Sequence, residues 1–560
     1  MKQWTVRLSV LFLFGAIAWY VPWLLMHLNM SLPWLSWPFA AANLLVTVMV
    51  VITALNCWRY AEPPLRPLPQ GDEEPVAVII PTYGEPPQMV YNTVKSVLDQ
   101  DYPLQQMRII VSDDGHSERI KNVVARLREE YPEGYIGYHE PPRKGDPARK
   151  GEAKAGNLNS AFDAVRQYAP EVSFIETRDA DDLVGDRSFL RHVVGQLVAD
   201  PRLAFVQTIK EVTCSPGDPF GNREPIFYRR TMLAKNAANA VFPCGSGVVW
   251  RREALEDIGG FPAWNLVEDL QSGVEALRRG WRGLYLPIVG AVGQIAPEDI
   301  PNAFKQRGTW ALDTMRLTLW GNKRGLSLGQ HIQFAELGFF YLMSFAVLVF
   351  AVVPCLKLTF NLYPLSTTEA EYMAHFWPFA IGIELLLAGL SLGLSFEELW
   401  RARMVWIGMS PVYARAVVLA LVFGPHRKPS YRVTRKEHVH AWYWRETWPQ
   451  MAIMFALAAA SLYHLATHSL LDNADLGSLF WAGFFIVGFS RIVRNSWFGL
   501  NPLREIARSL RRVWQPLGAQ ARAPWKGSEW AVTGVQPAPQ LRKAQLGQGL
   551  SDGREQHPDN

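Results

Sequence analysis

The sequence predicts an α/β domain, built on a mostly parallel sheet, that is inserted into a helical membrane domain. Two observations indicate this architecture. Long apolar runs flank a polar middle in the 560-residue chain, which is the pattern of a membrane protein. Within the polar middle, strand patterns alternate with helix patterns, as they do in parallel sheets that helices cover on both faces.

Six apolar stretches have the roughly 20 residues that a helix needs to cross about 30 Å of hydrocarbon. They lie near residues 7–28, 33–57, 334–358, 377–396, 447–467 and 477–498. The first is followed by WYVPWLLMHLNM, which contains no small-residue cleavage site. We therefore interpret it as a retained anchor and not as a secretory signal.

Lysine and arginine are unevenly distributed between these stretches. Residues 397–446 and the tail from Arg491 onward are rich in these two residues taken together, whereas residues 29–32, 359–376 and 468–476 contain neither. The positive-inside rule then predicts that both termini and the polar middle are cytoplasmic. The net charge of +5 follows from this bias. No basic stripe interleaved with aromatic residues indicates nucleic-acid binding.

Composition divides the chain into five parts. They are an N-terminal membrane region (1–61), a cytoplasmic α/β domain (72–300), interfacial helices (301–330), a C-terminal membrane region (331–500) and a cytoplasmic tail (501–560). The membrane region at 331–500 contains four of the predicted spans. Arginines and Pro411 interrupt the apolar residues 397–424, which favours an amphipathic helix at the membrane surface over another span. The tail is basic and then rich in Gln, Pro and Gly, so we expect a surface helix followed by disorder.

The α/β domain follows a proline-rich linker at 62–75. Strands are expected at 76–80, 107–115, 135–140 and 172–182, and helices at 89–100, 118–131 and 155–168. The motifs PTYGE, SDDG and RDADD each end a strand. Because ligands bind at the carboxyl ends of strands in such sheets, these motifs should converge on one edge.

The motif RDADD places Asp179, Asp181 and Asp182 close together. Like charges at this spacing repel unless a cation offsets them. Because side chains alternate along a strand, Asp179 and Asp181 should point the same way and Asp182 the opposite way. Such a pair suits Mg²⁺ or Mn²⁺, although alone it also fits a solvated turn or a helix N-cap.

Three further motifs contain residue types that bind phosphate or sugar. In KGEAKAGNLN, Lys150 and Lys154 stand beside glycines, either as phosphate ligands or as surface lysines at a helix start. The small residues of FPCGSG would let a sugar approach the backbone, or simply form a tight turn. Glu268 and Asp269 open a helix, a position where the helix dipole favours acids in any case.

Together these motifs resemble family 2 glycosyltransferases, and bacterial cellulose synthase catalytic subunits in particular. PTYGE, SDDG, KAGNLN, DAD, CGSG, VED and QRGTW run in the family's order between Val76 and Trp310. KPSYRVTRKE at 428–437 resembles the gating loop of the same enzymes. The resemblance implies a GT-A-type domain and a processive, inverting hexosyltransferase. Such an enzyme would polymerise hexose from a UDP-sugar, UDP-glucose first, into a β-glucan such as cellulose and move it across the membrane.

The resemblance also implies roles for individual residues. Contacts with the nucleotide-sugar are implied for Thr82, Tyr83, Glu85, Asp113, Asp114, Lys154 and Asp179. Asp179 and Asp181 would bind Mg²⁺ or Mn²⁺, and Asp269, next to Glu268, would be the catalytic base. Acceptor and product contacts are implied for Cys244, Gly245, Ser246, Gln306, Arg307 and Trp310, and a place in the gating loop for Tyr431, Val433 and Thr434.

The location and partners follow from the same resemblance. It implies a multi-pass protein of a bacterial inner membrane, in contact with lipid, the growing polysaccharide and a periplasmic export subunit. REIAR at 504–508 fits half of a PilZ site, but no [DN]xSxxG motif follows it, so we expect no cyclic di-GMP site in this chain.

One departure from the family's motifs leaves alternatives open, and so do the identity of the product and the place of two acids. Thr309 stands where the family has the arginine of its QxxRW motif, so either Arg307 compensates or leaving-group stabilisation is weaker. The product could also be a mixed-linkage glucan, curdlan, mannan or an amino-sugar polymer, or a single sugar transferred to a lipid carrier. Glu336 and Glu384 lie within apolar stretches and would either line a channel or lie at the headgroup level.

Overall fold

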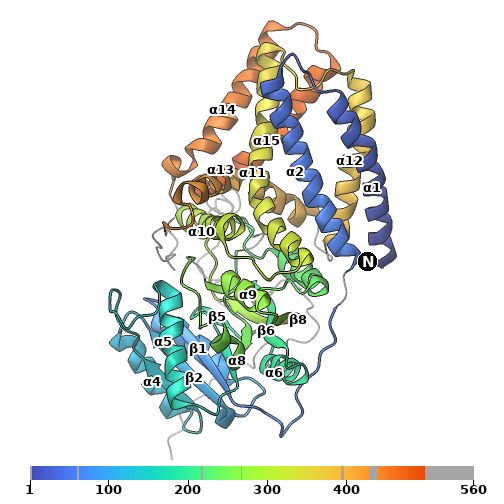
Figure 1. Ribbon diagram of the computed structural model, residues 1–560. Coiled ribbons are helices and arrows are strands. Elements are labelled where there is room, and N and C mark those ends of the chain that lie inside the picture. The colour runs from blue at the N-terminus through green and yellow to red at the C-terminus, as the bar shows by residue number, and fades with distance from the viewer. Residues whose placement is uncertain are drawn as a thin grey trace, which may run out of the picture. The chain divides into compact units, whose positions relative to one another are not determined.

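The computed structural model describes residues 3–59, 62–215, 218–265, 268–391, 396–427, 439 and 441–498. Contacts divide the chain into residues 1–508 and 509–560, and all described residues belong to the first unit. This unit combines a β-sheet and its covering helices with a group of long apolar helices (Figure 1). The predicted tail at 501–560 and the residues Tyr431, Val433 and Thr434 lie outside the described residues.

The sheet confirms the predicted α/β domain. Its strands are β1 (Val76–Thr82), β2 (Met107–Asp113), β3 (Tyr135–His139), β4 (Phe174–Thr177), β5 (Asp182–Leu183), β6 (Leu203–Val212), β7 (Val248–Arg251) and β8 (Arg282–Gly293). Their order in the eight-stranded sheet is β3-β2-β1-β4-β7-β6-β8-β5. The strands β1 to β4 pair in parallel, as predicted, whereas β7 is antiparallel to both of its neighbours. The sheet is therefore mixed.

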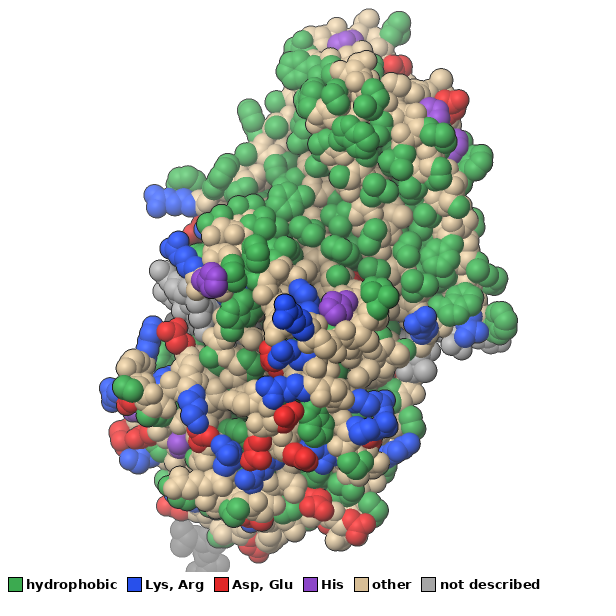
Figure 2. Space-filling view, in the orientation of Figure 1, with side chains coloured by type: hydrophobic (Ala, Val, Ile, Leu, Met, Phe, Trp, Pro, Cys, Tyr) green, Lys and Arg blue, Asp and Glu red, His purple; other side chains and the backbone are tan. Residues whose placement is uncertain are grey.

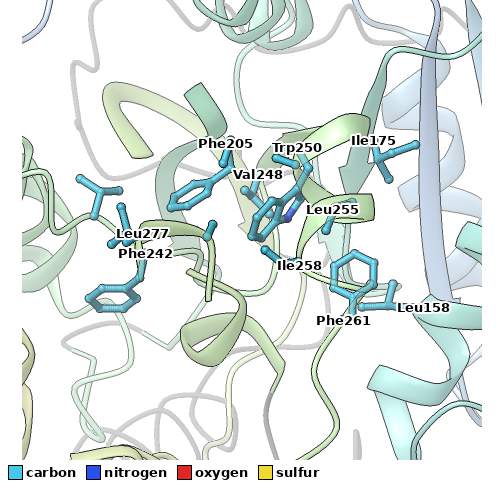
Figure 3. Close-up of a cluster of buried hydrophobic side chains, with 14 of the residues drawn as sticks. Leu158, Ile175, Phe205, Phe242, Val248, Trp250, Leu255, Ile258, Phe261 and Leu277 are labelled. Carbon is cyan, nitrogen blue, oxygen red and sulfur yellow. The ribbon is translucent and has the colours of Figure 1, made fainter. Parts of the chain in front are cut away.

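Helices cover both faces of the sheet. They are α3 (Pro87–Leu98), α4 (Glu118–Glu130), α5 (Ala153–Tyr168), α6 (Phe189–Ala199), α7 (Met232–Ala234), α8 (Arg252–Asp257) and α9 (Glu268–Arg278). Two hydrophobic clusters result. One contains Phe205, Trp250 and Phe261 and is drawn in Figure 3; the rings of Phe205 and Trp250 are 4.8 Å apart. The other contains Val78 and Val94. Because strand residues alternate between two buried faces, the strands read as nearly continuous apolar runs.

Among the described residues, seven helices are long and apolar enough to cross a membrane. They are α1 (Gln3–Met26), α2 (Pro33–Trp58), α11 (Leu328–Phe360), α12 (Glu369–Leu390), α13 (Phe396–Phe423), α14 (Trp444–Thr467) and α15 (Asn473–Phe498). Six of them match the predicted spans. On the face shown in Figure 2, apolar side chains dominate the region of these helices, whereas most of the charged side chains gather over the region of the sheet.

The remaining long helix, α13, is the segment for which the sequence predicts an interfacial position. It packs on one side against α10 (Ile300–Trp320), where Val405 and Met409 lie in one cluster with Ala311 and Met315. Length and composition allow either a span or a surface helix, so the interfacial placement of α13 stays a prediction. Helix α10 itself begins at an N-cap, since Asp299 accepts a hydrogen bond of 2.8 Å from the amide of Asn302.

The two acids inside the apolar stretches have partners that the sequence did not suggest. Glu336 is buried and lies 2.8 Å from the ammonium of Lys235, which belongs to the short helix η3 (Lys235–Ala238) in contact with α11. Glu384 accepts a hydrogen bond of 2.8 Å from Arg403 of α13. Glu336 is therefore part of a buried ion pair, which neither of the two predicted environments included.

The proline-rich linker lies along α6. The amide of Leu68 donates to the carbonyl of Arg191 (2.9 Å), and the Arg191 guanidinium donates back to the carbonyl of Leu68 (3.0 Å). Gln196 donates to the carbonyl of Pro64 at 2.6 Å. Gly195 permits this close approach, because a Cβ there would lie 2.1 Å from the carbonyl oxygen of Arg66. The linker is thus held on the domain over much of its length.

Candidate active site

The polar motifs at the ends of β1, β2 and β4 converge on one edge of the sheet, as predicted. Thr82 and Asp113 are paired in register at the ends of β1 and β2, and the amide of Asp114 donates to the carbonyl of Thr82 at 2.9 Å. Arg178, just after β4, donates its amide to the carbonyl of Ile79 at 3.0 Å. Parallel pairing brings these three chain segments to the same place because all three strands end there.

The PTYGE motif forms a compact turn after β1. One carboxylate oxygen of Glu85 accepts hydrogen bonds from the Thr82 hydroxyl (2.7 Å) and from the amide of Tyr83 (2.6 Å). The Tyr83 ring is 57% exposed. An exposed aromatic face beside a fixed carboxylate is compatible with the predicted nucleoside contact, which stays a prediction.

The two acids of SDDG are already engaged within the protein. Asp113 is fully buried and accepts from the amides of Gly115 (2.9 Å) and Ser117 (2.6 Å) and from the Tyr138 hydroxyl (3.0 Å). Asp114 forms a two-point ion pair with Arg149, with distances of 2.5 and 2.7 Å. Arg149 was not singled out from the sequence. Asp113 therefore organises the turn after β2 and Asp114 is held by Arg149, so the nucleoside contacts predicted for both stay predictions.

Asp179 lies between two lysines. The ammonium of Lys154 donates to Oδ1 at 2.6 Å, and the ammonium of Lys210, on β6, donates to Oδ2 at 3.0 Å. Although burial works in the opposite direction, these two positive charges hold the pKa of Asp179 below its usual range. Lys210 was missed by the sequence analysis. Its only signal is a charged residue directly after the run LAFVQTI, which begins with four apolar residues.

Asp182 does not point away from Asp179, so that expectation is wrong. Lys210 Nζ lies 2.7 Å from an oxygen of Asp182 as well as 3.0 Å from Asp179. The strand β4 ends at Thr177, and the amide of Asp182 donates to the carbonyl of Asp179 in a turn. Side-chain alternation therefore no longer applies in the acidic motif. Burial raises the pKa of Asp182, and the charges of Asp179 and Asp181 raise it further.

The predicted base, Asp269, and the predicted metal ligand Asp179 meet around Gly245. A Cβ built on Gly245 would lie 3.1 Å from Asp269, 3.3 Å from the ammonium of Lys154 and 3.9 Å from Asp179. Lys154 also donates to the carbonyl of Gly245 (3.0 Å) and lies 3.2 Å from Glu268. Gly245 has a φ of +82°, a conformation that favours glycine. The structure thus places side chains from α5, the acidic turn and α9 around one glycine.

The electrostatics of this region suit proton transfer. Burial, together with the neighbouring charge of Glu268, raises the pKa of Asp269 to about 7. A general base works best when its pKa is near the operating pH. Burial alone would lower the pKa of Lys154, but the charges of Asp179 and Glu268 raise it.

The CGSG motif is a turn between β6 and β7 that supports the acidic turn. The amide of Cys244 donates to Gln207 (2.7 Å), and the hydroxyl of buried Ser246 accepts from the amide of Asp179 (3.2 Å). The motif therefore forms a tight turn, which is one of the two interpretations that the sequence allowed. The acceptor contacts predicted for Cys244, Gly245 and Ser246 stay a prediction beside it.

The QRGTW motif lies on α10, but the structure does not bring its arginine to the acidic residues. Arg307 is buried and donates to Glu224 (2.8 Å), to the carbonyl of Gly221 (2.5 Å) and to the hydroxyl of Tyr413 (3.3 Å). The hydroxyl of Thr309 donates to a backbone carbonyl one turn earlier. Arg307 thus joins α10 to α13, and this geometry gives no support to its replacing the missing arginine at the diphosphate.

The other two residues predicted from the motif remain accessible. Trp310 is 36% exposed, and Gln306, one turn earlier, is half-buried. Residues four apart on a helix share a face. The acceptor contacts predicted for Gln306 and Trp310 therefore remain predictions.

The residues present fit a divalent cation that substrate would help to hold. Among the described residues, no group of three or more His, Cys, Asp or Glu side chains could hold a metal alone. Mg²⁺ is commonly bound by one or two carboxylates together with substrate phosphates. The carboxylates near Lys154 and Lys210 are those of Asp179, Asp181, Asp182, Glu268 and Asp269. Negative charge thus exceeds positive charge here, and Asp179 and Asp181 remain the candidate ligands.

Comparisons with known proteins agree with this geometry. Residues 74–312 match the family model described as glycosyltransferase like family 2. The chain is 27% identical over 395 residues to the UDP-forming cellulose synthase catalytic subunit of Pseudomonas fluorescens (strain SBW25), covering 68% of this chain and 50% of that protein. It is 31% identical over 378 residues to putative cellulose synthase 2 of Komagataeibacter xylinus, covering 65% of this chain and 23% of that protein. The chain therefore spans half or less of the length of these two relatives.

A solved structure is similar at a lower level. The mannosyltransferase PcManGT from Pyrobaculum calidifontis, in complex with GDP-Man and Mn²⁺, gives a TM-score of 0.49 at 20% identity. The match covers 69% of this chain and 99% of that one. At this TM-score the likeness supports no inference about this chain.

Proposed function

We propose that the chain is a processive, inverting glycosyltransferase of a bacterial inner membrane, because residues 74–312 match the family model described as glycosyltransferase like family 2. It transfers hexose from a UDP-sugar, with UDP-glucose as the leading donor, to a growing β-glucan such as cellulose. The long apolar helices then move the product across the membrane. The growing polysaccharide, membrane lipid and a periplasmic export subunit are its proposed partners.

One observation carries the proposal: Asp179, Lys154 and Asp269 meet around Gly245 although they come from three separate segments. The distances from a Cβ on Gly245 to their nearest polar atoms are 3.1 to 3.9 Å. Glycosyl transfer needs a cation-binding acid, a positive charge and a base within the reach of one sugar ring. An unrelated surface function would not need to bring these three together.

The chemistry follows from the positions of these side chains. A sugar hydroxyl is a poor nucleophile at neutral pH, so Asp269 accepts its proton as the oxygen attacks the anomeric carbon. Negative charge develops on the departing UDP, and the ammonium of Lys154 lies where it can offset that charge. A divalent cation bound by Asp179 and Asp181 would stabilise the same charge. One displacement inverts the anomeric centre, so an α-linked donor gives a β-linkage.

The test uses the full chain purified in detergent. We expect UDP release from UDP-glucose in the presence of Mg²⁺ or Mn²⁺, and loss of release after a chelator is added. A panel of other UDP-sugars and digestion of the product with linkage-specific glycosidases identify the sugar and linkage. Absence of UDP release from every donor, by protein that is folded and loaded with metal, would refute the proposal.

The geometry of α10 favours a second candidate, the non-processive transfer of one sugar to a lipid carrier. Arg307 is occupied by Glu224, and Thr309 bonds within its own helix. A site with less positive charge near the diphosphate is expected to complete fewer transfers before product leaves. Product length with radiolabelled donor separates the two functions. Polymer from wild type supports processive synthesis, whereas single-sugar lipid products that Thr309→Arg converts to longer chains support the second.

The predicted orientation completes the proposal. The connections around Asn29 and Pro364, which lie in segments free of Lys and Arg, are joined by a hydrogen bond of 3.0 Å. A common side of the membrane for both connections agrees with the positive-inside prediction. Cysteine labelling from outside intact cells, at Ser31 and at Ser117 changed to cysteine, should modify the first position only.

A further inference from the structure

Lys210 is a residue of the acidic site to which neither the motifs nor the proposed reaction assigns a role. It stands on β6, in a strand whose other residues up to Ile209 are buried. Its side chain is 23% exposed, and its ammonium lies 3.0 Å from Asp179 and 2.7 Å from Asp182. One lysine is therefore shared by Asp179, a candidate metal ligand, and by Asp182, which was not assigned to the metal.

The two lysines on Asp179 differ in what else holds them. Lys154 has further partners in Glu268, at 3.2 Å, and in the carbonyl of Gly245, at 3.0 Å. Lys210 has Asp182, which is almost fully buried. If one oxygen of Asp179 turns to a metal ion, Lys210 can release it and keep a full ion pair with Asp182. Asp182 would then prevent the lysine from becoming a buried, unpaired charge.

We propose that Lys210 is an internal counter-ion that occupies the cation position on Asp179 and moves onto Asp182 when a divalent cation binds, and so sets the affinity for metal. This inference rests on the proposed function, since it assumes that Asp179 is a metal ligand. An ammonium and a divalent cation compete for the same carboxylate oxygen, so the affinity for metal reflects the cost of displacing Lys210. Asp182 lowers that cost.

The test measures the binding of Mn²⁺ alone to the full chain in detergent, by the electron paramagnetic resonance signal of free Mn²⁺. Lys210→Gln removes the charge but keeps a hydrogen-bond donor for Asp182, and we expect it to bind Mn²⁺ at least about tenfold more tightly. Lys210→Arg keeps the charge and should bind like wild type. Lys95→Gln, at an exposed ion pair with Asp99, is the matched control and should change nothing.

A double-variant cycle separates this role from a simple change in local charge. Asp182→Asn should weaken Mn²⁺ binding because Lys210 then has no second acid to accept it. In the Lys210→Gln background the same change should have much less effect, since no lysine needs a new partner. An equal effect of Asp182→Asn in both backgrounds, or unchanged or weaker binding by Lys210→Gln, overturns the proposal.

A measurement on the wild-type protein decides the matter if Lys210→Gln fails to fold. Acetylation of lysines, followed by peptide mass spectrometry, should label Lys210 faster when Mn²⁺ is present, while Lys95 serves as the internal reference. Unchanged or slower labelling of Lys210 overturns the proposal. Protein that passes these binding tests but releases no UDP from any donor would refute the proposed transfer reaction and leave the role of Lys210 standing.

Discussion

Two buried clusters of charge in this protein are built differently. At the joint between the sheet domain and the long helices, Lys235 faces Glu336 at 2.8 Å, and Gln333 accepts from the same ammonium at 2.9 Å. Asn56 of α2 completes the group by accepting from Gln333 at 2.6 Å. One positive charge meets one negative charge, and neutral amides fill the remaining hydrogen-bonding positions.

The candidate active site is unbalanced by comparison. Lys154 and Lys210 are surrounded by five carboxylates, and the pKa of Asp269 rises to about 7 through burial and the charge of Glu268. A cluster whose charges balance needs no further ion, and it can hold the sheet domain against the long helices. A cluster with excess negative charge lowers its energy by binding a proton or a cation, which is what a metal-dependent transferase requires.

The largest expected effect comes from Asp269→Asn in the unbalanced cluster. Transfer should fall by about 10²- to 10⁴-fold, because the acceptor hydroxyl loses its base. UDP binding and the unfolding midpoint should change little, because an amide still fits the position. UDP release and UDP titration check both statements. Asp257→Asn, at an exposed ion pair with Arg279, is the control; equal losses in the two variants would remove Asp269 from the mechanism.

Changes in the balanced cluster of Lys235 and Glu336 should lower the stability of the protein and leave the rate of transfer unchanged. Glu336→Gln leaves the charge of Lys235 buried without its partner and should cost about 3 kcal/mol of unfolding free energy. Replacing both, as Lys235→Met with Glu336→Leu, should restore most of it, because the unpaired charge is gone. Denaturation in detergent measures these differences. A double variant as unstable as the single one would show that the pair itself, and not its charge balance, stabilises the joint.

Metal binding is expected at the cluster with excess negative charge and not at the Lys235–Glu336 pair. At about one hundred times its dissociation constant, Mn²⁺ should stabilise wild type by about 2.7 kcal/mol. Asp181→Asn should lose that gain because it removes a ligand, whereas Asp163→Asn, at an exposed pair with Lys150, should retain it. Unfolding midpoints with and without Mn²⁺ decide the point, and undiminished stabilisation of Asp181→Asn would exclude Asp181 as a ligand.

The smallest effect is expected at Gly245, where the side chains of the unbalanced cluster meet. Gly245→Ala places a methyl group 3.1 Å from Asp269, and transfer should fall about tenfold, equivalent to about 1.4 kcal/mol of barrier. Gly259→Ala has the same φ of +82° but nothing within 4 Å of the added methyl group. It should lose similar stability without losing transfer. Kinetics and unfolding of the two variants separate crowding from backbone strain.

The sequence predicted those parts of the fold and site that depend on local pattern. The strands β1, β2 and β4 lie where apolar runs predicted them, because such runs are local signals, but their ends differ: β1 continues to Thr82, beyond the predicted 80, whereas β2 and β4 end at Asp113 and Thr177, before the predicted 115 and 182. The antiparallel insertion of β7 between β4 and β6 could not be predicted, because four strand-forming residues at 248–251 specify no partner.

Partners distant in sequence were missed for a related reason. Lys210 follows the buried part of its strand, and nothing nearby in sequence indicates that it faces Asp179. The direction of Asp182 was wrong because the strand was assumed to continue through the acidic motif. Lys235 and Glu336 are separated by about a hundred residues, so only the folded chain shows that they neutralise each other.

The attachment of the proline-rich linker to α6 affects where a fragment of this protein should begin. Arg191 and Gln196 donate hydrogen bonds to the carbonyls of Leu68 and Pro64, so residues before the first strand are structural members of the sheet domain. A soluble fragment that starts at Val76 would expose the part of α6 that the linker covers. It would also remove the carbonyl of Leu68, which accepts a hydrogen bond from Arg191. A fragment that starts at Glu62 keeps that part of α6 covered and is the better choice for crystallisation or antibody selection.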